Sequence, residues 1–177
     1  IRDRHNAIVT IGNFRKGQSI LIQGASSGVG LMGLQIAKHL GAKLVIGTST
    51  KPEKFDKLKS IGADLVVNSK DKDWVDNVLQ ATNNEGVDLI IDQLSGYTIN
   101  ENMKASKVKG TIVNVGRLAG GNTEFNCDLH ALRRINYRGV TFRTRSINEI
   151  REVYSKMWSD LGDLVVKGKL SLSLIHI

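Results

Sequence analysis

The fold is decided by the stretch Ser19-Ile20-Leu21-Ile22-Gln23-Gly24-Ala25-Ser26-Ser27-Gly28-Val29-Gly30. Its apolar beginning predicts a buried strand, and the apolar spacing from Val29 to Leu40, ended by Gly41, predicts a helix. The glycines between them let the backbone turn sharply and let a phosphate approach the free amides of the helix N-terminus. A strand, a glycine-rich turn and a helix in this order are typical of a turn that receives a dinucleotide pyrophosphate.

The rest of the chain alternates short β-branched runs with longer amphipathic stretches, a pattern typical of βαβ units around a parallel sheet. We therefore expect a Rossmann-type, doubly wound α/β fold with six parallel strands in the order 3-2-1-4-5-6 and Ser26 to Val29 at the switch point. The expected strands are 19–23, 43–47, 65–67, 87–91, 111–115 and 139–142. The expected helices are 29–40, 53–60, 72–80, 128–135 and 147–161.

A length of 177 residues fits one domain with a core of its own. We expect a helical lead-in from a preceding domain over residues 1–14 and a dinucleotide-binding domain over residues 15–169. The apolar tail 170–177 has no obvious partner strand in the sequence, so we expect it to be truncated or foreign.

The net charge of +8 would suit a nucleic-acid binder, but the basic residues are spread along the chain without a dense tract. We expect no nucleic-acid partner, and a phosphate-bearing cofactor would also be attracted by this charge. The sequence has no apolar run of about 20 residues and no signal peptide, which predicts a cytoplasmic protein without a membrane partner.

Cysteine and histidine usage argues against a metal site. The single cysteine, Cys127, excludes an internal disulfide and a cysteine-rich zinc site. The four histidines are scattered without the spacing of metal ligands. We therefore assign no metal ligand and expect no zinc.

Several motifs together resemble the medium-chain dehydrogenase/reductase superfamily, and most of all its quinone oxidoreductases. The stretch from Gly17 to Gly30 carries the resemblance, together with Gln35-Ile36-Ala37-Lys38, Gly41-Ala42-Lys43, Glu53-Lys54, Gly62-Ala63-Asp64, Gly86-Val87-Asp88-Leu89-Ile90-Ile91-Asp92 and Gly110-Thr111-Ile112-Val113-Asn114-Val115-Gly116. The similarity extends roughly from Phe14 to Lys169. One position departs from the pattern, because Ser27 stands where the quinone oxidoreductases usually have a glycine. Serine is small and its hydroxyl can reach a phosphate oxygen, so we expect the turn to survive.

This resemblance implies a zinc-independent, NADPH-dependent oxidoreductase that transfers hydride to a quinone, an enone or a related carbonyl compound. In that family a nucleotide-binding domain interrupts a catalytic domain, so the resemblance implies that most of the substrate domain lies outside this chain. It further implies that the isolated fragment is inactive and that the protein forms a homodimer through its sixth strand, where Val140-Thr141-Phe142 would lie at an exposed edge.

The end of the second strand indicates which nucleotide is bound. Domains that prefer NAD usually place an acidic residue there, about 20 residues after the glycine turn, to hold the ribose hydroxyls. This chain has Ser49, Thr50 and Lys51 instead, followed by Lys54. Small hydroxyls and a lysine can hold a 2′-phosphate through charge-assisted hydrogen bonds, which predicts NADPH.

Strand ends elsewhere supply the other candidate cofactor-binding residues, because ligands of open α/β sheets bind at the carboxyl ends of the strands. Phe142, Arg143 and Thr144 are added from the resemblance, which places that stretch near the nicotinamide. The full set is Gly24, Ser26, Ser27, Gly28, Val29, Gly30, Ser49, Thr50, Lys54, Asp92, Asn114, Gly116, Arg117, Phe142, Arg143 and Thr144. The sequence identifies no catalytic residue and no specific substrate.

Three other functions are alternatives, two of them enzymes and one a binding module. A short-chain dehydrogenase needs a tyrosine followed four residues later by a lysine, and none of Tyr97, Tyr137 and Tyr154 has one. A zinc-dependent alcohol dehydrogenase is disfavoured by the lone cysteine, although most of its ligands would lie in the other domain. An NADPH-binding sensor that catalyses nothing is the second hypothesis, and turnover of a quinone with NADPH would separate it from an enzyme.

Overall fold

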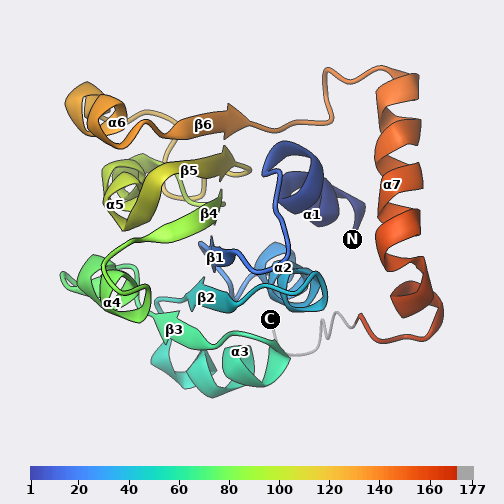
Figure 1. Cartoon of the computed structure of the whole chain (residues 1–177), viewed down its shortest axis with the longest axis horizontal. Helices are drawn as coiled ribbons and strands as arrows, with labels where there is room; N and C mark the ends of the chain where they lie inside the picture. The colour runs from blue at the N-terminus through green and yellow to red at the C-terminus, as the bar shows by residue number, and fades with distance from the viewer. Residues whose placement is uncertain (171–177) are drawn as a thin grey trace.

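The computed structural model describes residues 1–170 and contains a six-stranded parallel sheet in the order β3-β2-β1-β4-β5-β6 (Figure 1). The strands are β1 Ser19–Ile22, β2 Leu44–Thr48, β3 Leu65–Val67, β4 Val87–Asp92, β5 Ser106–Asn114 and β6 Asn136–Gly139. The predicted α/β fold and strand order are confirmed. The direction of the strand order changes between β1 and β4, and the turn that follows β1 lies at this switch point.

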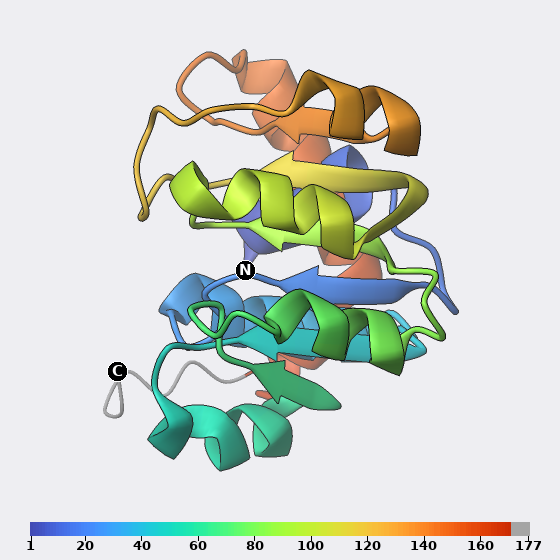
Figure 2. The ribbon, with the colours of Figure 1, turned by 90° about the vertical axis from the view of Figure 1, so that its left-hand side faces the viewer.

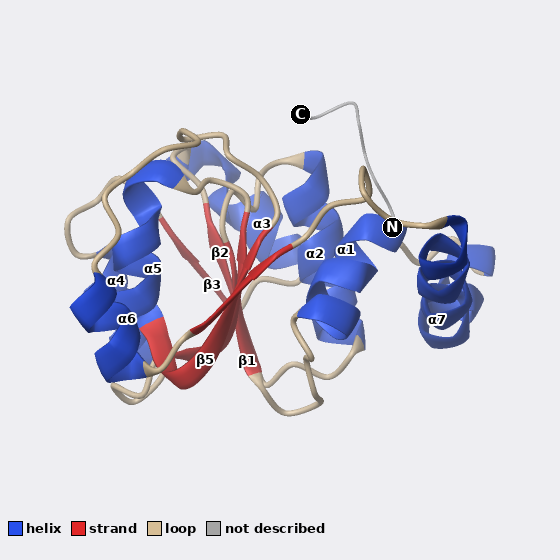
Figure 3. Cartoon of the chain, turned by 90° about the horizontal axis from the view of Figure 1, so that it is seen from above, coloured by secondary structure: helices blue, strands red, loops and turns tan. Residues whose placement is uncertain are grey.

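Helices cover both faces of the sheet. They are α1 Arg2–His5, α2 Gly28–His39, α3 Phe55–Ile61, α4 Trp74–Ala81, α5 Ile99–Ala105, α6 Cys127–Arg133 and α7 Ile147–Val166, with a π-helical turn η1 Asn6–Ile11 and 3-10 turns η2 Pro52–Lys54 and η3 Gly96–Thr98. Figure 2 shows α4, α5 and α6 along one face. Figure 3 shows α1 and α2 on the other face and α7 outside them. Helix α3 packs beside α2.

The strands are buried because helices cover both sides of the sheet. All four residues of β1 are buried, and successive side chains point to opposite faces. Ile20 and Ile22 join the apolar cluster under α2, whereas Leu21 joins the cluster that contains Val78 and Met103 of α4 and α5. The first strand is thus anchored on both faces and presents its carboxyl end to the glycine turn.

Two predictions of local structure were wrong. Strand β6 is Asn136–Gly139, and the predicted stretch 139–142 lies largely in the loop to α7. Strand β6 lies at the edge of the sheet and is mostly exposed, so its sequence is polar. The more apolar residues 139–142 that follow it were therefore predicted as the strand instead. Helix α5 and the turn η3 between β4 and β5 were not predicted. The remaining elements differ from the expected ranges mainly at their ends, and β5 begins earlier than expected, at Ser106.

The lead-in predicted over residues 1–14 is helical, formed by α1 and η1. His5 anchors it, because its buried ring lies 2.8 Å from a carboxylate oxygen of Asp160 on α7. The predicted tail 170–177 lies outside the described residues except for Leu170. Among the helices of residues 1–170, none is long and apolar enough to cross a bilayer.

Candidate nucleotide-binding site

The turn after β1 requires glycine at two positions, Gly24 for its backbone angle and Gly30 for a close approach of the backbone. Gly24 has a φ of +64°, and its amide donates to Thr48 Oγ1 at 2.9 Å. The amide of Ala25 donates to the carbonyl oxygen of Thr48 at 2.8 Å, which ties the turn to the end of β2. A Cβ atom on Gly30 would lie 2.4 Å from the Cα atom of Ala25, so helix α2 can begin this close to the turn only without a side chain there.

Ser27, the departure from the family pattern, is the N-cap of α2. Its backbone has a φ of −78°, which any residue adopts, and its hydroxyl accepts from the amide of Gly30 at 3.0 Å. The same hydroxyl lies 2.8 Å from the carbonyl oxygen of Gly24 and 3.0 Å from Gln93 Oε1, to which it can donate. The turn survives the substitution, as expected, and the hydroxyl serves the turn itself.

The start of α2 has backbone amides that are free to bind an anion. In the described part of the chain, no acceptor is recorded for the amides of Gly28 and Val29. These amides belong to the first helical turn, where unpaired donors and the helix dipole favour a negative group. The start of α2 therefore has donors suited to an anion, and its contact with a phosphate stays a prediction.

A buried polar network that the sequence did not reveal supports the turn from below. Thr48 Oγ1 donates to Gln23 Oε1 at 2.8 Å, and Gln23 Nε2 donates to Asn102 Oδ1 at 2.6 Å. Gln93 Nε2 donates to the carbonyl oxygen of Gln23 at 2.9 Å. The sequence does contain one sign of this network. A polar residue stands at or just after the end of β1, β2 and β4, where a buried strand would otherwise continue with apolar residues.

The end of β2 brings three of the predicted residues together. The hydroxyl of Ser49 lies 3.3 Å from the hydroxyl of Ser26 in the glycine turn, and Ser49 is only 2% exposed. Lys54, in the turn η2, lines the same cavity as Ser26. Thr50, the next residue, is exposed. Two hydroxyls and a lysine, with no acid among these residues, form a suitable environment for a phosphate.

Asp92, at the end of β4, closes the turn that follows. Its Oδ1 accepts from the amides of Leu94 and Ser95, both at 2.9 Å, and the residue is fully buried. Burial raises the pKa of this carboxyl, and the amides of Ser95 and Leu94, together with the nearby Asn102 side chain, oppose that shift only in part. Its Oδ2 atom has no partner among the described residues. Asp92 thus shapes the carboxyl end of the sheet, and its contact with a cofactor stays a prediction.

Asn114 and Gly116 stand at the end of β5. Asn114 Nδ2 donates to Tyr137 Oη at 2.7 Å and to Ser95 Oγ at 2.9 Å. Ser95 Oγ in turn donates to the carbonyl oxygen of Gly116 at 2.9 Å. A Cβ atom on Gly116 would lie 2.6 Å from the carbonyl oxygen of Gln93, so a glycine is required by close backbone approach.

The remaining predicted residues lie further out. Arg117 is exposed, as are Arg143 and Thr144 in the loop between β6 and α7. The ring of Phe142 lies between two cations, with the Arg2 guanidinium 4.2 Å and the Arg145 guanidinium 4.9 Å from its centroid. These contacts attach the loop to α1.

A small cavity of about 130 Å³ lies at the carboxyl ends of the central strands. Ile22 of β1, Ile91 of β4 and Val115 form its sheet side, Val29 forms its α2 side, and residues of α1 and η1 complete it. The lead-in helix therefore shields one side of the strand ends next to the glycine turn.

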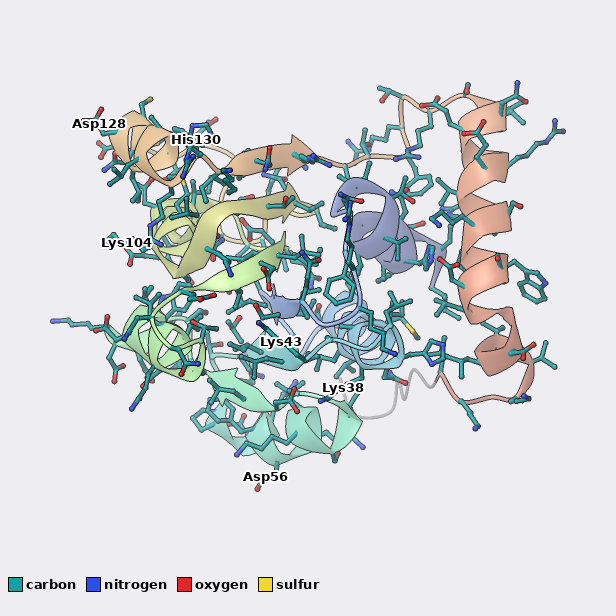
Figure 4. The ribbon with its side chains drawn as sticks, in the orientation of Figure 1. Lys38, Lys43, Asp56, Lys104, Asp128 and His130 are labelled. Atoms are coloured by element: carbon teal, nitrogen blue, oxygen red, sulfur yellow. The ribbon has the colours of Figure 1, made fainter. Side chains whose placement is uncertain are left out.

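Metal ligands are not brought together in the described residues. No group of three His, Cys, Asp or Glu side chains there could hold a metal ion, so we derive no step through zinc. Asp128 and His130 point away from each other on α6, in agreement with their spacing in the sequence (Figure 4).

The doubly wound parallel sheet, with its glycine turn at the switch point, defines a dinucleotide-binding domain of the Rossmann type. Residues 28–159 match the model of the zinc-binding dehydrogenase family, so the chain belongs to that family of oxidoreductases. The resemblance to medium-chain dehydrogenases/reductases is thereby confirmed.

Individual relatives are consistent with this assignment. A highly reducing polyketide synthase of Emericella nidulans is 32% identical over 166 residues, which cover 91% of this chain and 6% of the synthase. A quinone oxidoreductase of Pseudomonas syringae has the same fold, with a TM-score of 0.80 at 23% identity over 97% of this chain and 53% of that chain. A mycobacterial protein solved in complex with NADPH has a TM-score of 0.80 at 23% identity over 92% of this chain and 51% of that chain. The chain thus spans about half the length of these solved structures.

Proposed function

We propose that this chain is the NADPH-binding domain of an oxidoreductase that transfers hydride to a quinone, an enone or a related carbonyl compound. The observation that carries the proposal is the capped glycine turn at the switch point, with Ser26, Ser49 and Lys54 beside it. The mycobacterial neighbour in complex with NADPH, which has the same fold, supports the choice of nucleotide.

Each part of the site has a role in this proposal. The amides of Gly28 and Val29 bind the pyrophosphate, with the dipole of α2 directed toward its charge. The hydroxyls of Ser26 and Ser49 and the ammonium group of Lys54 bind the 2′-phosphate. The strand ends around Asp92, Asn114 and Gly116 border the remainder of the dinucleotide.

When bound, NADPH supplies the hydride, and the protein contributes position and exclusion of water. The apolar cavity beside Ile22, Val29 and Val115 lies at the strand ends and gives the nicotinamide a dry surface. We propose that the loop residues Phe142, Arg143 and Thr144 approach this end of the cofactor. A proton must also reach the substrate to complete the reduced product, and we assign no proton donor among residues 1–170. We further propose that the reaction needs no zinc.

Relatives favour an activated carbon–carbon double bond or a quinone as the hydride acceptor. One relative is a highly reducing polyketide synthase, and one neighbour in fold is a quinone oxidoreductase. The test is consumption of NADPH, followed at 340 nm, with phenanthrenequinone and with a 2-enoyl thioester. We expect turnover by a protein that contains both domains and none by this chain alone. Turnover of neither substrate by the longer protein, with NADPH still bound, would favour the sensor hypothesis.

A further inference from the structure

A cavity beside the glycine turn lies between the outer sides of α2 and α3, and residues at and just after the end of α7 close it. Its volume of about 450 Å³ is in the range of small-molecule sites. The lining residues are Ser26, Leu31, Gln35, Lys38, His39, Lys54, Lys57, Leu58, Ser60, Ile61, Leu164, Lys169 and Leu170. Ser26 and Lys54 belong to the proposed nucleotide site, and the other residues extend away from it along the helices.

Basic groups dominate the polar part of this lining. Four lysines and His39 take part, and none of the described lining residues is acidic. Lys38 is paired with Asp64, and it lies between α2 and α3 in Figure 4. The carboxylate of Asp56, on α3, points away from the cavity (Figure 4). No acidic partner is recorded for Lys57 or Lys169 among residues 1–170, and both side chains are exposed. The cavity therefore has a positive potential that an anion would lower.

The other part of the lining is apolar. Leu31 of α2, Leu58 of α3 and Leu164 of α7 form a wall, to which Ile61 and Leu170 add. A cavity filled only by the anionic part of a ligand would leave this wall in contact with water. An apolar group on the same ligand would cover it and gain hydrophobic free energy.

We propose that this cavity binds an amphiphilic anion, in which an aromatic or aliphatic group lies against the leucine wall and a carboxylate, sulfonate or phosphate lies between Lys57 and Lys169. This site goes beyond the proposed function, because neither lysine is part of the nucleotide site. The two ligands would be neighbours at Lys54, so each weakens the binding of the other without excluding it.

The test uses the fluorescent anion 1-anilinonaphthalene-8-sulfonate, titrated with the natively folded chain. Lys57→Ala combined with Lys169→Ala should weaken its binding at least tenfold. Lys72→Ala combined with Lys104→Ala is the matched control, since it removes the same charge from other parts of the surface, and it should change the affinity less than twofold. Leu164→Ala tests the apolar wall and should also weaken binding. The uncharged analogue N-phenyl-1-naphthylamine should bind the unmodified chain at least tenfold more weakly than the anion.

Several results would overturn the proposal. One is equal weakening by the two double variants, and another is equal affinity for the charged and uncharged dyes. Complete displacement of the anion by saturating NADPH would place it in the nucleotide site instead. Decanoate and phenyl phosphate, added separately, should compete with the dye, and competition by neither would also contradict the proposal. The comparison of variants does not require NADPH, so its outcome is independent of the proposed function.

Discussion

Gly30 and Gly33 lie one turn apart on α2, and we expect alanine to have opposite effects at the two positions. A Cβ atom on Gly30 would meet the Cα, carbonyl carbon and carbonyl oxygen of Ala25 at 2.4, 2.6 and 2.6 Å. For a Cβ atom on Gly33, the three nearest atoms belong to the side chain of Ile22, at 3.4 to 3.8 Å. Carbon atoms prefer about 3.5–4.0 Å, so the first substitution must displace buried backbone and the second fits.

The magnitudes follow from these contacts. Forced overpacking costs about 1–3 kcal/mol, and at Gly30 the upper part of that range applies because Ala25 is fixed by its hydrogen bond to Thr48. Alanine in the interior of a helix is favoured over glycine by about 1 kcal/mol. For a chain of this size we therefore expect Gly30→Ala to lower the melting temperature by roughly 4–12 °C and Gly33→Ala to raise it by about 2–4 °C.

Thermal unfolding followed by circular dichroism, with NADPH titration of each folded variant, is the assay. Gly30→Ala should also impair nucleotide binding, because the turn moves with Ala25. At Gly33 the nearest contact, 3.4 Å from the side chain of Ile22, leaves room for a methyl group between helix and sheet. Equal destabilisation by both variants would refute the steric argument.

Three further predictions concern ionisation and assembly. Because the pKa of Asp92 is raised in the folded state, its contribution to stability falls as pH rises from the ordinary pKa of an aspartate through the folded value. In urea unfolding, Asp92→Asn should remove this part of the pH dependence while keeping both amide hydrogen bonds. An unchanged pH profile would contradict the prediction. Burial lowers the pKa of His5 more than Asp160 raises it, with Lys156 also lowering it. Stability from His5 is thus complete above about pH 6.5 and is lost as pH falls through the folded pKa, and in His5→Gln the unfolding free energy should vary less between pH 5 and 7. Strand β6 forms an exposed edge, so we expect dimers in light scattering at high concentration, and a strict monomer would count against pairing.

The sequence was sufficient for the central features of the fold because burial on both faces leaves a clear pattern. The apolar runs of β1 to β4 and the glycine turn predicted the strand order and the switch point correctly. Strand β6 and helix α5 were missed because their sequences carry no such pattern. Asn136–Gly139 is an exposed edge with little burial to record, and Ile99–Ala105 is too short to show a helical period.

Some features of the candidate site could likewise be predicted from the sequence, and others could not. Local chemistry predicted that the turn tolerates Ser27, whose hydroxyl caps the helix. The adjacency of Ser26 and Ser49, by contrast, depends on how β2 packs beside the turn. The network of Gln23, Thr48 and Asn102 joins residues far apart in the chain, so no local pattern reveals it.

Calorimetric titration of NADPH and NADH tests the central claim most directly, with the unmodified chain compared with Ser49→Asp combined with Lys54→Ala. The aspartate repels a 2′-phosphate and can accept from a free ribose hydroxyl, and loss of Lys54 removes a cation that only the phosphate needs. Because Ser49 is 2% exposed, urea unfolding must first show that the double variant is folded, and Lys54→Ala alone serves as the second variant. Lys104→Ala is the control for net charge.

We predict that the unmodified chain prefers NADPH, less strongly as salt rises, because exposed charges are screened over about 8 Å at physiological ionic strength. The double variant should bind NADPH roughly ten- to a hundredfold more weakly and NADH equally well or better, since a charge-assisted hydrogen bond contributes about 1.5–3 kcal/mol. Equal affinity of the unmodified chain for both nucleotides, or equal loss of both in the double variant, would contradict the assignment of NADPH.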